Sequence, residues 1–372
     1  MNPRRVCSAC FGNQDLRGWI REYGGRRGCD FCGKFDSPTV EFNKLVPRID
    51  KCIGHYYGRA VDQLGYCSAE GGYLGEHWDA YDMLEKIEID LPRDDGTLFY
   101  AIAGAMEEEP WCDYDVGALE LDHAMWSSWE DFCETVKHKR RFFFHHSGRD
   151  DQDSFTPASL LSSIAKASEA LGLVIELPVG QKLWRARTDI GKRRRVGAKD
   201  FGPPPVEFAL QSNRMNPAGI PMLYLASSQT TALKETRTRE AKVGRWRSVR
   251  PLRILDLRRL PPVPSIFSEK PRALALTLNF LHDFANDIMK PVERSNQVHV
   301  DYLPSQVITE FMRDYDFTGG PLDGVAYGST VHRIGWNLAL FVGPVELGLA
   351  APEWEEAPPQ AFEFDCATWA IA

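Results

Sequence analysis

Two pairs of cysteines near the start of the chain constrain its fold more than any other sequence feature. Cys7-x-x-Cys10 is followed, after 18 intervening residues, by Cys29-x-x-Cys32. Each pair can place two thiolates on one tight turn, and two such turns supply the four sulfurs of a tetrahedral zinc site. Because four thiolates leave no open coordination position, the pattern predicts a structural Zn²⁺ at these four cysteines. The alternative is four unrelated reduced thiols in a flexible arm.

The composition indicates a folded chain with two or three domains. Of its 372 residues, 43% are hydrophobic and 11% are aromatic, which is enough for well-packed cores. A net charge of −8 argues against a chain that coats nucleic acid. The best candidate for a membrane span, residues 335–351, is too short and carries Glu346. We therefore expect a cytoplasmic protein with reduced thiols and no membrane partner.

Local patterns divide the sequence into four segments. We expect a four-cysteine zinc-binding segment at 1–50, a helical regulatory or sensor region at 51–174, a catalytic domain at 175–350 and a C-terminal tail at 351–372. Strands are predicted at 182–187, 222–227, 252–257, 323–328 and 336–343. Helices are predicted at 126–136, 157–171, 229–241, 272–289 and 304–315. The segment after about residue 350 has the pattern of an irregular tail with an aromatic end.

One strand–turn–helix unit can bring an aromatic ring and an acid close together. Residues 222–227 have the pattern of a short buried strand, and Ser228 can cap a helix that begins near Gln229. Glu235 then falls in the second turn of that helix, while Tyr224 lies on the strand. The two side chains can therefore meet in one cleft, provided that the strand and the helix turn the corresponding faces toward each other.

Together with two arginines and a serine, this pair suits chemistry on a dinucleotide. The guanidinium of Arg185, with that of Arg214, can hold a pyrophosphate through bidentate hydrogen bonds. The Tyr224 ring can stack on a positively charged nicotinamide. Breaking the nicotinamide–ribose bond leaves positive charge on the ribose, which Glu235 can stabilise, and nicotinamide departs as a neutral molecule. The Ser329 hydroxyl can fix a ribose or amide group.

Each of these residues also has an ordinary structural explanation. Arg185 suits an exposed strand, and Tyr224 suits an aromatic core. Glu235 can pair with Arg239, four residues further along a helix, and Ser329 can shape a turn. Taken one at a time, the residues do not identify a site, and only their combination does.

The segments in the second half of the sequence resemble the RES-domain family, which is named for its Arg, Glu and Ser. The resemblance is carried by Leu183-Trp184-Arg185, Arg214-x-Asn216-x-x-Gly219, the run from Tyr224 to Glu235, Asp323-Gly324-x-x-Tyr327-x-Ser329, and residues 335–341. It implies an α+β fold with an ADP-ribosyltransferase-like split β core, preceded by a zinc-ribbon-like and mainly helical N-terminal region. Catalysis is then expected at Arg185, Tyr224, Glu235 and Ser329, and NAD⁺ binding at Arg185, Arg214, Asn216, Tyr224, Ser227 and Asn337.

The same resemblance implies a toxin-like effector, in bacterial toxin or anti-phage defence systems, with NAD⁺ as its substrate. The expected reaction is cleavage of the nicotinamide–ribose bond by hydrolysis or phosphorolysis, and the first alternative is mono-ADP-ribosylation of a protein. Arg187 shares a strand face with Arg185, so alternation does not decide which guanidinium is functional. The trigger, a protein inhibitor or sensor partner, and assembly into a homo-oligomer stay open.

The first half of the sequence resembles the N-terminal region that accompanies some HEPN and RES toxins. Arg140 and His145 have the Arg-x4-His spacing of the catalytic pair in HEPN ribonucleases. The three Phe residues between them indicate core packing, however, and the basic run 139–141 indicates a solvated helix end. A HEPN-like ribonuclease or nucleic-acid-binding module using Arg140 and His145 is therefore the second alternative.

Overall fold

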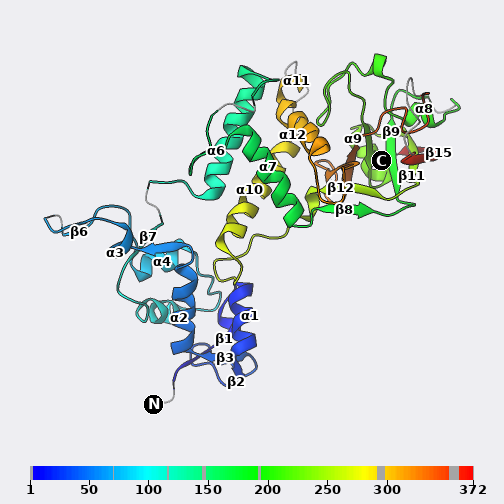
Figure 1. The fold of residues 1–372 in the computed structure, drawn as a ribbon. Coiled ribbons are helices and arrows are strands. Elements are labelled where there is room, and N and C mark those ends of the chain that lie inside the picture. Colours follow the sequence, from blue (N-terminus) through cyan, green and yellow to red (C-terminus); the bar gives the residue numbers. More distant parts are fainter. Residues whose placement is uncertain are drawn as a thin grey trace. The chain divides into compact units, whose positions relative to one another are not determined.

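The computed structural model describes residues 3–69, 71–114, 117–144, 148–191, 194–290, 298–351 and 360–371 (Figure 1). The chain divides into two compact units. The first comprises Met1–Leu121 and Pro262–Leu278, and the second comprises Asp122–Pro261 and Asn279–Ala372. Pro262–Leu278 thus belongs to the first unit, although its sequence neighbours on both sides belong to the second. The four segments expected from the sequence stay a prediction of domain organisation.

The first unit combines short strands and helices around one buried core. Its strands are β1 (Arg5–Cys7), β2 (Gly25–Arg26), β3 (Pro38–Glu41), β4 (Tyr57–Arg59), β5 (Tyr66–Cys67), β6 (Gly72–Tyr73) and β7 (Trp111–Asp113). Its helices are the 3₁₀ turn η1 (Ser8–Cys10), α1 (Gln14–Tyr23), α2 (Phe42–Ile53), α3 (Ala60–Gln63), α4 (Ala80–Lys86) and α5 (Thr97–Ala103). Strands β1, β3 and β2 form an antiparallel sheet, and β4–β7 and β5–β6 form two ribbons.

Helix α1 begins where the sequence supplies a cap, and it buries one face. The Asn13 side chain accepts hydrogen bonds from the backbone N–H groups of Asp15 and Leu16, at 3.0 and 3.1 Å. These bonds satisfy two of the donors that the first helical turn leaves free. Leu16 and Ile20 lie four residues apart on one face and are fully buried.

The Pro262–Leu278 segment is held in the first unit by apolar burial and by polar contacts. Phe267 is only 3% exposed in the core of that unit. Arg48 donates to the carbonyl oxygen of Phe267 at 3.1 Å, and the Ser265 hydroxyl donates to the Asp15 carboxylate at 2.6 Å. Burial of an aromatic ring of this size stabilises its unit by about 2–3 kcal/mol.

The helices of the second unit are α6 (Leu121–Glu134), the π-helical turn η2 (Thr135–Lys139), α7 (Pro157–Ala170), α8 (Ala198–Phe201), η3 (Val206–Phe208), α9 (Gln229–Glu235), η4 (Leu257–Arg259), α11 (Val298–Asp301) and α12 (Leu303–Asp314). Helix α10 (Arg272–Met289) begins in the first unit and ends in the second. Helix α12 packs on α7 (Figure 1) and also contacts η2. None of the helices that the structure describes has the length and apolar composition to cross a membrane.

Helix α7 confirms the helix predicted from residue 157. The Thr156 hydroxyl accepts from the N–H of Ser159 at 3.3 Å, and Pro157 occupies the first position, where no N–H is needed. Leu160 and its neighbours on the same face are buried. Gly172, with φ of 66°, turns the chain away in the left-handed region that glycine adopts without strain.

An eight-stranded sheet forms the rest of the second unit. Its strands are β8 (Val174–Leu177), β9 (Lys182–Arg187), β10 (Leu223–Ala226), β11 (Glu240–Ser248), β12 (Leu252–Asp256), β13 (Gly324–Gly328), β14 (Trp336–Leu340) and β15 (Phe362–Ile371). The strand order is β15-β11-β9-β10-β14-β13-β12-β8. All neighbouring strands are antiparallel except β12 and β13, which are parallel. The sheet is therefore mixed, and the fold belongs to the α+β class.

The helix predicted across 229–241 is wrong beyond Glu235. Helix α9 ends there, and Arg237 adopts a left-handed conformation with φ of 56°. The Thr236 hydroxyl donates to the carbonyl of Leu233 at 2.6 Å, which satisfies a group that the helix end leaves free. Residues from Glu240 onward form β11, which pairs with β9.

The irregular tail predicted after residue 350 is also wrong. Phe362–Ile371 forms β15, which pairs with β11 along its whole length at the edge of the sheet. Cross-strand ion pairs join Arg245 to Asp365, at 2.7 Å, and Arg247 to Glu363. This strand is stabilised by a partner more than a hundred residues away in sequence, so its local pattern gave no clear signal.

Candidate functional site

A cavity of about 380 Å³ lies where β9 and β10 separate. The two strands pair with each other only at Ala226 and Trp184. Beyond this point Arg185–Arg187 pairs with β11 and not with β10. The cavity is lined by residues from the strands on both sides of this gap and from α9, namely Trp184, Arg185, Ala186, Arg187, Asn213, Tyr224, Leu225, Ala226, Ala232, Glu235, Thr236, Tyr327 and Asn337. Three of the four residues expected to be catalytic, Arg185, Tyr224 and Glu235, therefore share one cavity.

Glu235 is held at the cavity by two donors that converge on one of its oxygens. Its Oε1 accepts hydrogen bonds from the Ser329 hydroxyl at 2.7 Å and from Asn337 Nδ2 at 2.6 Å. No residue in the described part of the chain donates to Oε2. The side chain is half-buried, at the end of a helix capped by Ser228 as predicted. Because the helix ends at Glu235, the pairing with Arg239 does not form.

Ser329 acts on Glu235 rather than lining the cavity itself. Its hydroxyl oxygen accepts from the backbone N–H groups of Val331 and His332, at 3.3 and 3.1 Å. With both acceptor positions occupied, the hydroxyl proton is directed toward Glu235. The side chain of Glu235 is thereby fixed through one acceptor oxygen.

A second set of contacts fastens the Ser329 loop to α9. The Thr231 hydroxyl lies 2.8 Å from Nδ1 of His332 and 2.8 Å from the hydroxyl of Ser228. Gly335 is packed against this contact, since a Cβ there would lie 2.4 Å from the Thr231 hydroxyl oxygen and 2.7 Å from His332 Nδ1. The loop and the helix therefore have no room for a side chain between them.

We expect Gly335→Ala to destabilise the protein by about 1–3 kcal/mol, because the added methyl forces the loop away from α9. Thermal denaturation measures the loss. Gly328→Ala is the matched control, since its Cβ would meet nothing within 4 Å. Equal melting temperatures for the two variants would contradict the prediction.

Two guanidinium groups line the cavity from β9. Arg185 Nη1 donates to the carbonyl oxygen of Gly202 at 3.0 Å, and Arg187 Nη2 donates to the same oxygen at 3.4 Å. Neither arginine forms an ion pair with a carboxylate of the described residues. Burial, and then the positive charge of Arg187, lower the pKa of Arg185 to about 9. The two arginines therefore give this side of the cavity a positive charge.

Tyr224 is fixed by its hydroxyl group. The hydroxyl donates to Asn216 Oδ1 at 2.6 Å and accepts from the N–H of Met215 at 3.2 Å. Asn216 is buried, and its Nδ2 donates to the carbonyl of Ile220 at 2.7 Å. Burial raises the pKa of Tyr224, so the phenol is neutral near pH 7. Asn216 thus orients the ring instead of lining the cavity.

Tyr327 is a site residue that was not expected from the sequence. It lies directly opposite Asn337 in the β13–β14 pair, so both side chains are on the same side of the sheet as the cavity. Burial raises the pKa of the Tyr327 hydroxyl. A signal was present, because Tyr327 stands two residues before Ser329 in one of the motifs that carry the family resemblance.

Arg214 and Ser227 are not among the residues that line the cavity. Arg214 Nη1 donates to the carbonyl oxygens of Ile288 and Lys290, at 2.7 and 2.9 Å, at the end of α10. The Ser227 hydroxyl accepts from the N–H of Trp336 at 3.0 Å and ties the end of β10 to β14. Both side chains therefore have structural partners, and their expected roles in NAD⁺ binding stay predictions.

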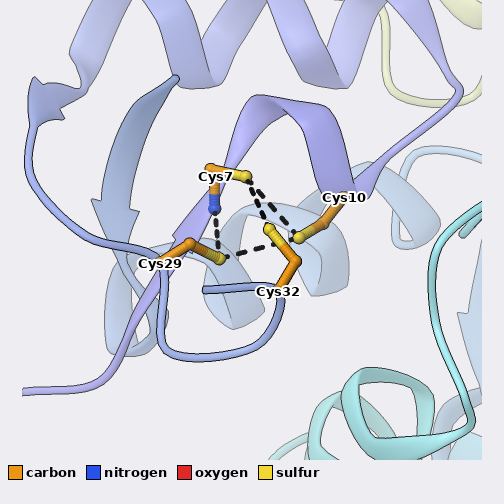
Figure 2. Close-up of side chains that lie close together, drawn as sticks. All are labelled: Cys7, Cys10, Cys29 and Cys32. Atoms are coloured by element: carbon orange, nitrogen blue, oxygen red, sulfur yellow. Dashed lines mark hydrogen bonds between the residues drawn. The ribbon is translucent and has the colours of Figure 1, made fainter. Parts of the chain in front are cut away.

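The four predicted zinc ligands gather in the first unit (Figure 2). The Sγ–Sγ distances are 3.6 Å for Cys7–Cys10, 3.5 Å for Cys7–Cys32 and 3.7 Å for Cys10–Cys29, and all four sulfurs lie within 4.8 Å of one another. Zn–S bonds of about 2.3 Å in a tetrahedron require S–S separations of about 3.8 Å. The cluster could therefore hold a metal ion and is compatible with zinc.

The HEPN-like pair is described only in part. Arg140 is exposed and follows η2, with its N–H donating to the carbonyl of Thr135 at 2.8 Å. His145 lies outside the described residues. Phe142 and Phe143 are 82% and 83% exposed, so the expected core packing of these rings is wrong. No specific contact among the described residues supports a ribonuclease site here.

Comparison with protein families matches both halves of the chain. Residues 22–150 match the family described as HEPN/RES N-terminal domain 1, and residues 182–365 match the RES domain. No curated protein and no solved structure matches the chain. The RES match contains every residue that lines the cavity, and the two matches together cover most of the sequence. The resemblance seen in the sequence is confirmed: the chain carries a HEPN/RES N-terminal domain and a RES domain.

Proposed function

We propose that this protein is a toxin-type or defence-type effector that cleaves the nicotinamide–ribose bond of NAD⁺. The RES and HEPN/RES matches support an NAD-related effector. The observation that supports this specific reaction is the position of Glu235 and its hydrogen bonds. One of its oxygens is fixed by Ser329 and Asn337, and the side chain lines the cavity that it shares with Arg185.

The geometry favours a reaction that develops positive charge. As the bond to nicotinamide breaks, its electron pair goes to the leaving nitrogen and the ribose C1′ becomes an oxocarbenium-like centre. A fixed carboxylate oxygen of Glu235 would stabilise that charge without reorganisation. Nicotinamide leaves as a neutral molecule, so no second carboxylate has to donate a proton.

Aromatic rings would hold the nicotinamide end. Tyr224 and Tyr327 both line the cavity, and the faces of phenol rings attract a pyridinium cation. The hydrogen bond from Tyr224 to Asn216 would keep its ring from rotating with the ligand. Arg185 and Arg187 would provide the positive charge for the phosphates.

The acceptor of the ribosyl group defines the product. In hydrolysis the water oxygen bonds to C1′, one proton is released, and ADP-ribose and nicotinamide form. In phosphorolysis the acceptor is inorganic phosphate, and in mono-ADP-ribosylation it is a protein side chain. All three reactions would take place in the same cavity, so a single analysis of the products distinguishes them.

We further propose an ADP-ribosyltransferase-like split β core for the sheet of the second unit. The support is the single pair that joins β9 to β10, with the cavity where the strands separate. We also propose that the cysteine cluster binds a structural Zn²⁺, since four thiolates complete a tetrahedron. A regulatory or sensor role is proposed for the N-terminal half, with a protein inhibitor as its expected kind of partner.

Mass spectrometry of the products from full-length protein and adenine-labelled NAD⁺ tests the proposed reaction. We expect free nicotinamide, with label in ADP-ribose if water attacks or in ADP-ribose 1″-phosphate if phosphate attacks. Label on protein would identify transfer instead. Intact NAD⁺ after prolonged incubation, with and without phosphate and a cell extract, would overturn the proposal.

A further inference from the structure

Two cations on β9 share one neutral acceptor. Arg185 and Arg187 are two residues apart, so their side chains lie on one face of the strand. Both donate to the carbonyl oxygen of Gly202. Gly244 stands opposite Arg185 on β11, and the Phe201 ring packs 2.4 Å from where its Cβ would be, which brings α8 and Gly202 close to the arginines.

One carbonyl oxygen cannot occupy all the donors of the two arginines, and the Asp189 carboxylate acts on Arg185 only at longer range, where it favours the charged form. Each guanidinium has five N–H donors, whereas one carbonyl oxygen has two lone pairs. Among the residues that the structure describes, neither Arg185 nor Arg187 forms an ion pair with a carboxylate. Lys242 lies opposite Arg187 on β11, and its ammonium donates to the carbonyl of Arg194 at 2.7 Å. Like charges in partly buried surroundings repel each other unless an anion joins them.

We infer that Arg185 and Arg187 together bind the diphosphate of the substrate, so that Arg187 supplies the second guanidinium expected at Arg214. The inference rests on the proposed function. A diphosphate carries two negative charges and offers oxygens that match the planar forks of two arginines. Arg214 instead holds the carbonyls at the end of α10, where a cation is favoured by the helix dipole.

The position of the pair relative to Glu235 fits one dinucleotide. Strand β10 separates β9, which bears the arginines, from β14, which bears Asn337, the partner of Glu235. Strands are spaced about 4.8 Å apart, so these two groups of side chains start about 10 Å from each other. A ligand with its diphosphate at β9 can therefore reach Glu235 with the adjoining ribose. The site then selects diphosphate-linked nicotinamide nucleotides over nicotinamide mononucleotide.

Binding measurements separate this inference from the reaction itself. Full-length protein carrying Glu235→Gln is titrated with ADP-ribose in a calorimeter, with and without Arg187→Gln. We expect Arg187→Gln to weaken ADP-ribose binding at least tenfold, and Arg214→Gln to weaken it less. Arg245→Gln is the matched control, because Arg245 is paired with Asp365 and lies opposite Trp184, on the other face from the cationic pair. It should bind as the parent does.

The kinetic experiment uses the active protein. Arg187→Gln should reduce kcat/KM for NAD⁺ more than kcat/KM for nicotinamide mononucleotide, so the preference between the two substrates narrows. If Arg187→Gln fails to fold, Arg187→Lys replaces it, because lysine keeps the positive charge but lacks the planar guanidinium that binds two oxygens at once. This variant is expected to lose at least threefold in ADP-ribose affinity. Unchanged ADP-ribose affinity in the folded Arg187 variant, or a larger loss in Arg214→Gln, would overturn the inference. ADP-ribose binding that depends on Arg187 without any NAD⁺ cleavage would instead refute only the proposed reaction.

Discussion

Glu235→Gln is expected to abolish NAD⁺ consumption, lowering kcat/KM by about 10²–10³-fold or more, while the fold is retained. The amide has the size of the carboxylate, and its oxygen can still accept from Ser329 and Asn337. What is lost is the negative charge of a side chain that lines the cavity. Removal of one preorganised group that stabilises developing charge has an effect on the order of 10²–10³ in rate.

The measurement is NAD⁺ loss followed by chromatography, together with thermal denaturation of the same samples. Glu176→Gln is the matched control, because Glu176 is exposed on β8, at the opposite edge of the sheet from β15. It undergoes the same change of charge and should keep full activity. Wild-type rates in Glu235→Gln, or equal losses in both variants, would argue against Glu235 as the group that stabilises the ribosyl cation.

Replacing Cys29 and Cys32 by serine is expected to remove bound zinc and to unfold the first unit. Zinc at a four-thiolate site contributes an apparent binding free energy on the order of 10 kcal/mol, which is comparable to the stability of a whole domain. The short sheet β1–β3–β2 is small, and Cys7, at the end of β1, is itself part of the cluster. Apart from the metal, the two cysteine turns are joined by the backbone hydrogen bond from Asp30 to Arg5 and by their share of the core.

Elemental analysis of the purified protein should give one zinc per chain, and none in the double variant. Tryptophan fluorescence during thermal denaturation reports the loss of the unit through Trp111, which is buried in its core. Cys67→Ser is the matched control, since Cys67 lies on β5 outside the cluster. Zinc-free protein with an unchanged melting temperature in the double variant would show that the thiols need no metal.

The elements that the sequence predicts well are those stabilised by their own residues. Strands β10, β12, β13 and β14 are short, mostly apolar and mostly buried runs, and α7 carries its own cap and stop. Strands β11 and β15 were missed because they stabilise each other across a long separation. Four successive buried residues in β11 also obscure the alternation that identifies a strand.

The candidate site could be predicted in its residue types but only partly in its geometry. Glu235 was correctly joined to a strand–turn–helix unit, yet its partners lie 94 and 102 residues further along the chain. Only tertiary structure decides which donors reach a side chain over such separations. The same limit applies to Arg214, whose partners at the end of α10 could not be anticipated from a motif of local residues.

The chain crosses between its two units three times, after Leu121, Pro261 and Leu278. A single proteolytic cut near residue 121 would therefore not separate the two units, because Phe267 stays packed in the core of the first unit. A fragment that starts after residue 170 would lack that core and would expose the Phe267 ring to water. Such a fragment is expected to aggregate. A lack of enzymatic activity in the fragment would therefore not show whether the missing residues inhibit the protein. A truncation that tests the N-terminal half therefore has to keep Pro262–Leu278 together with Met1–Leu121, because both contribute to one core.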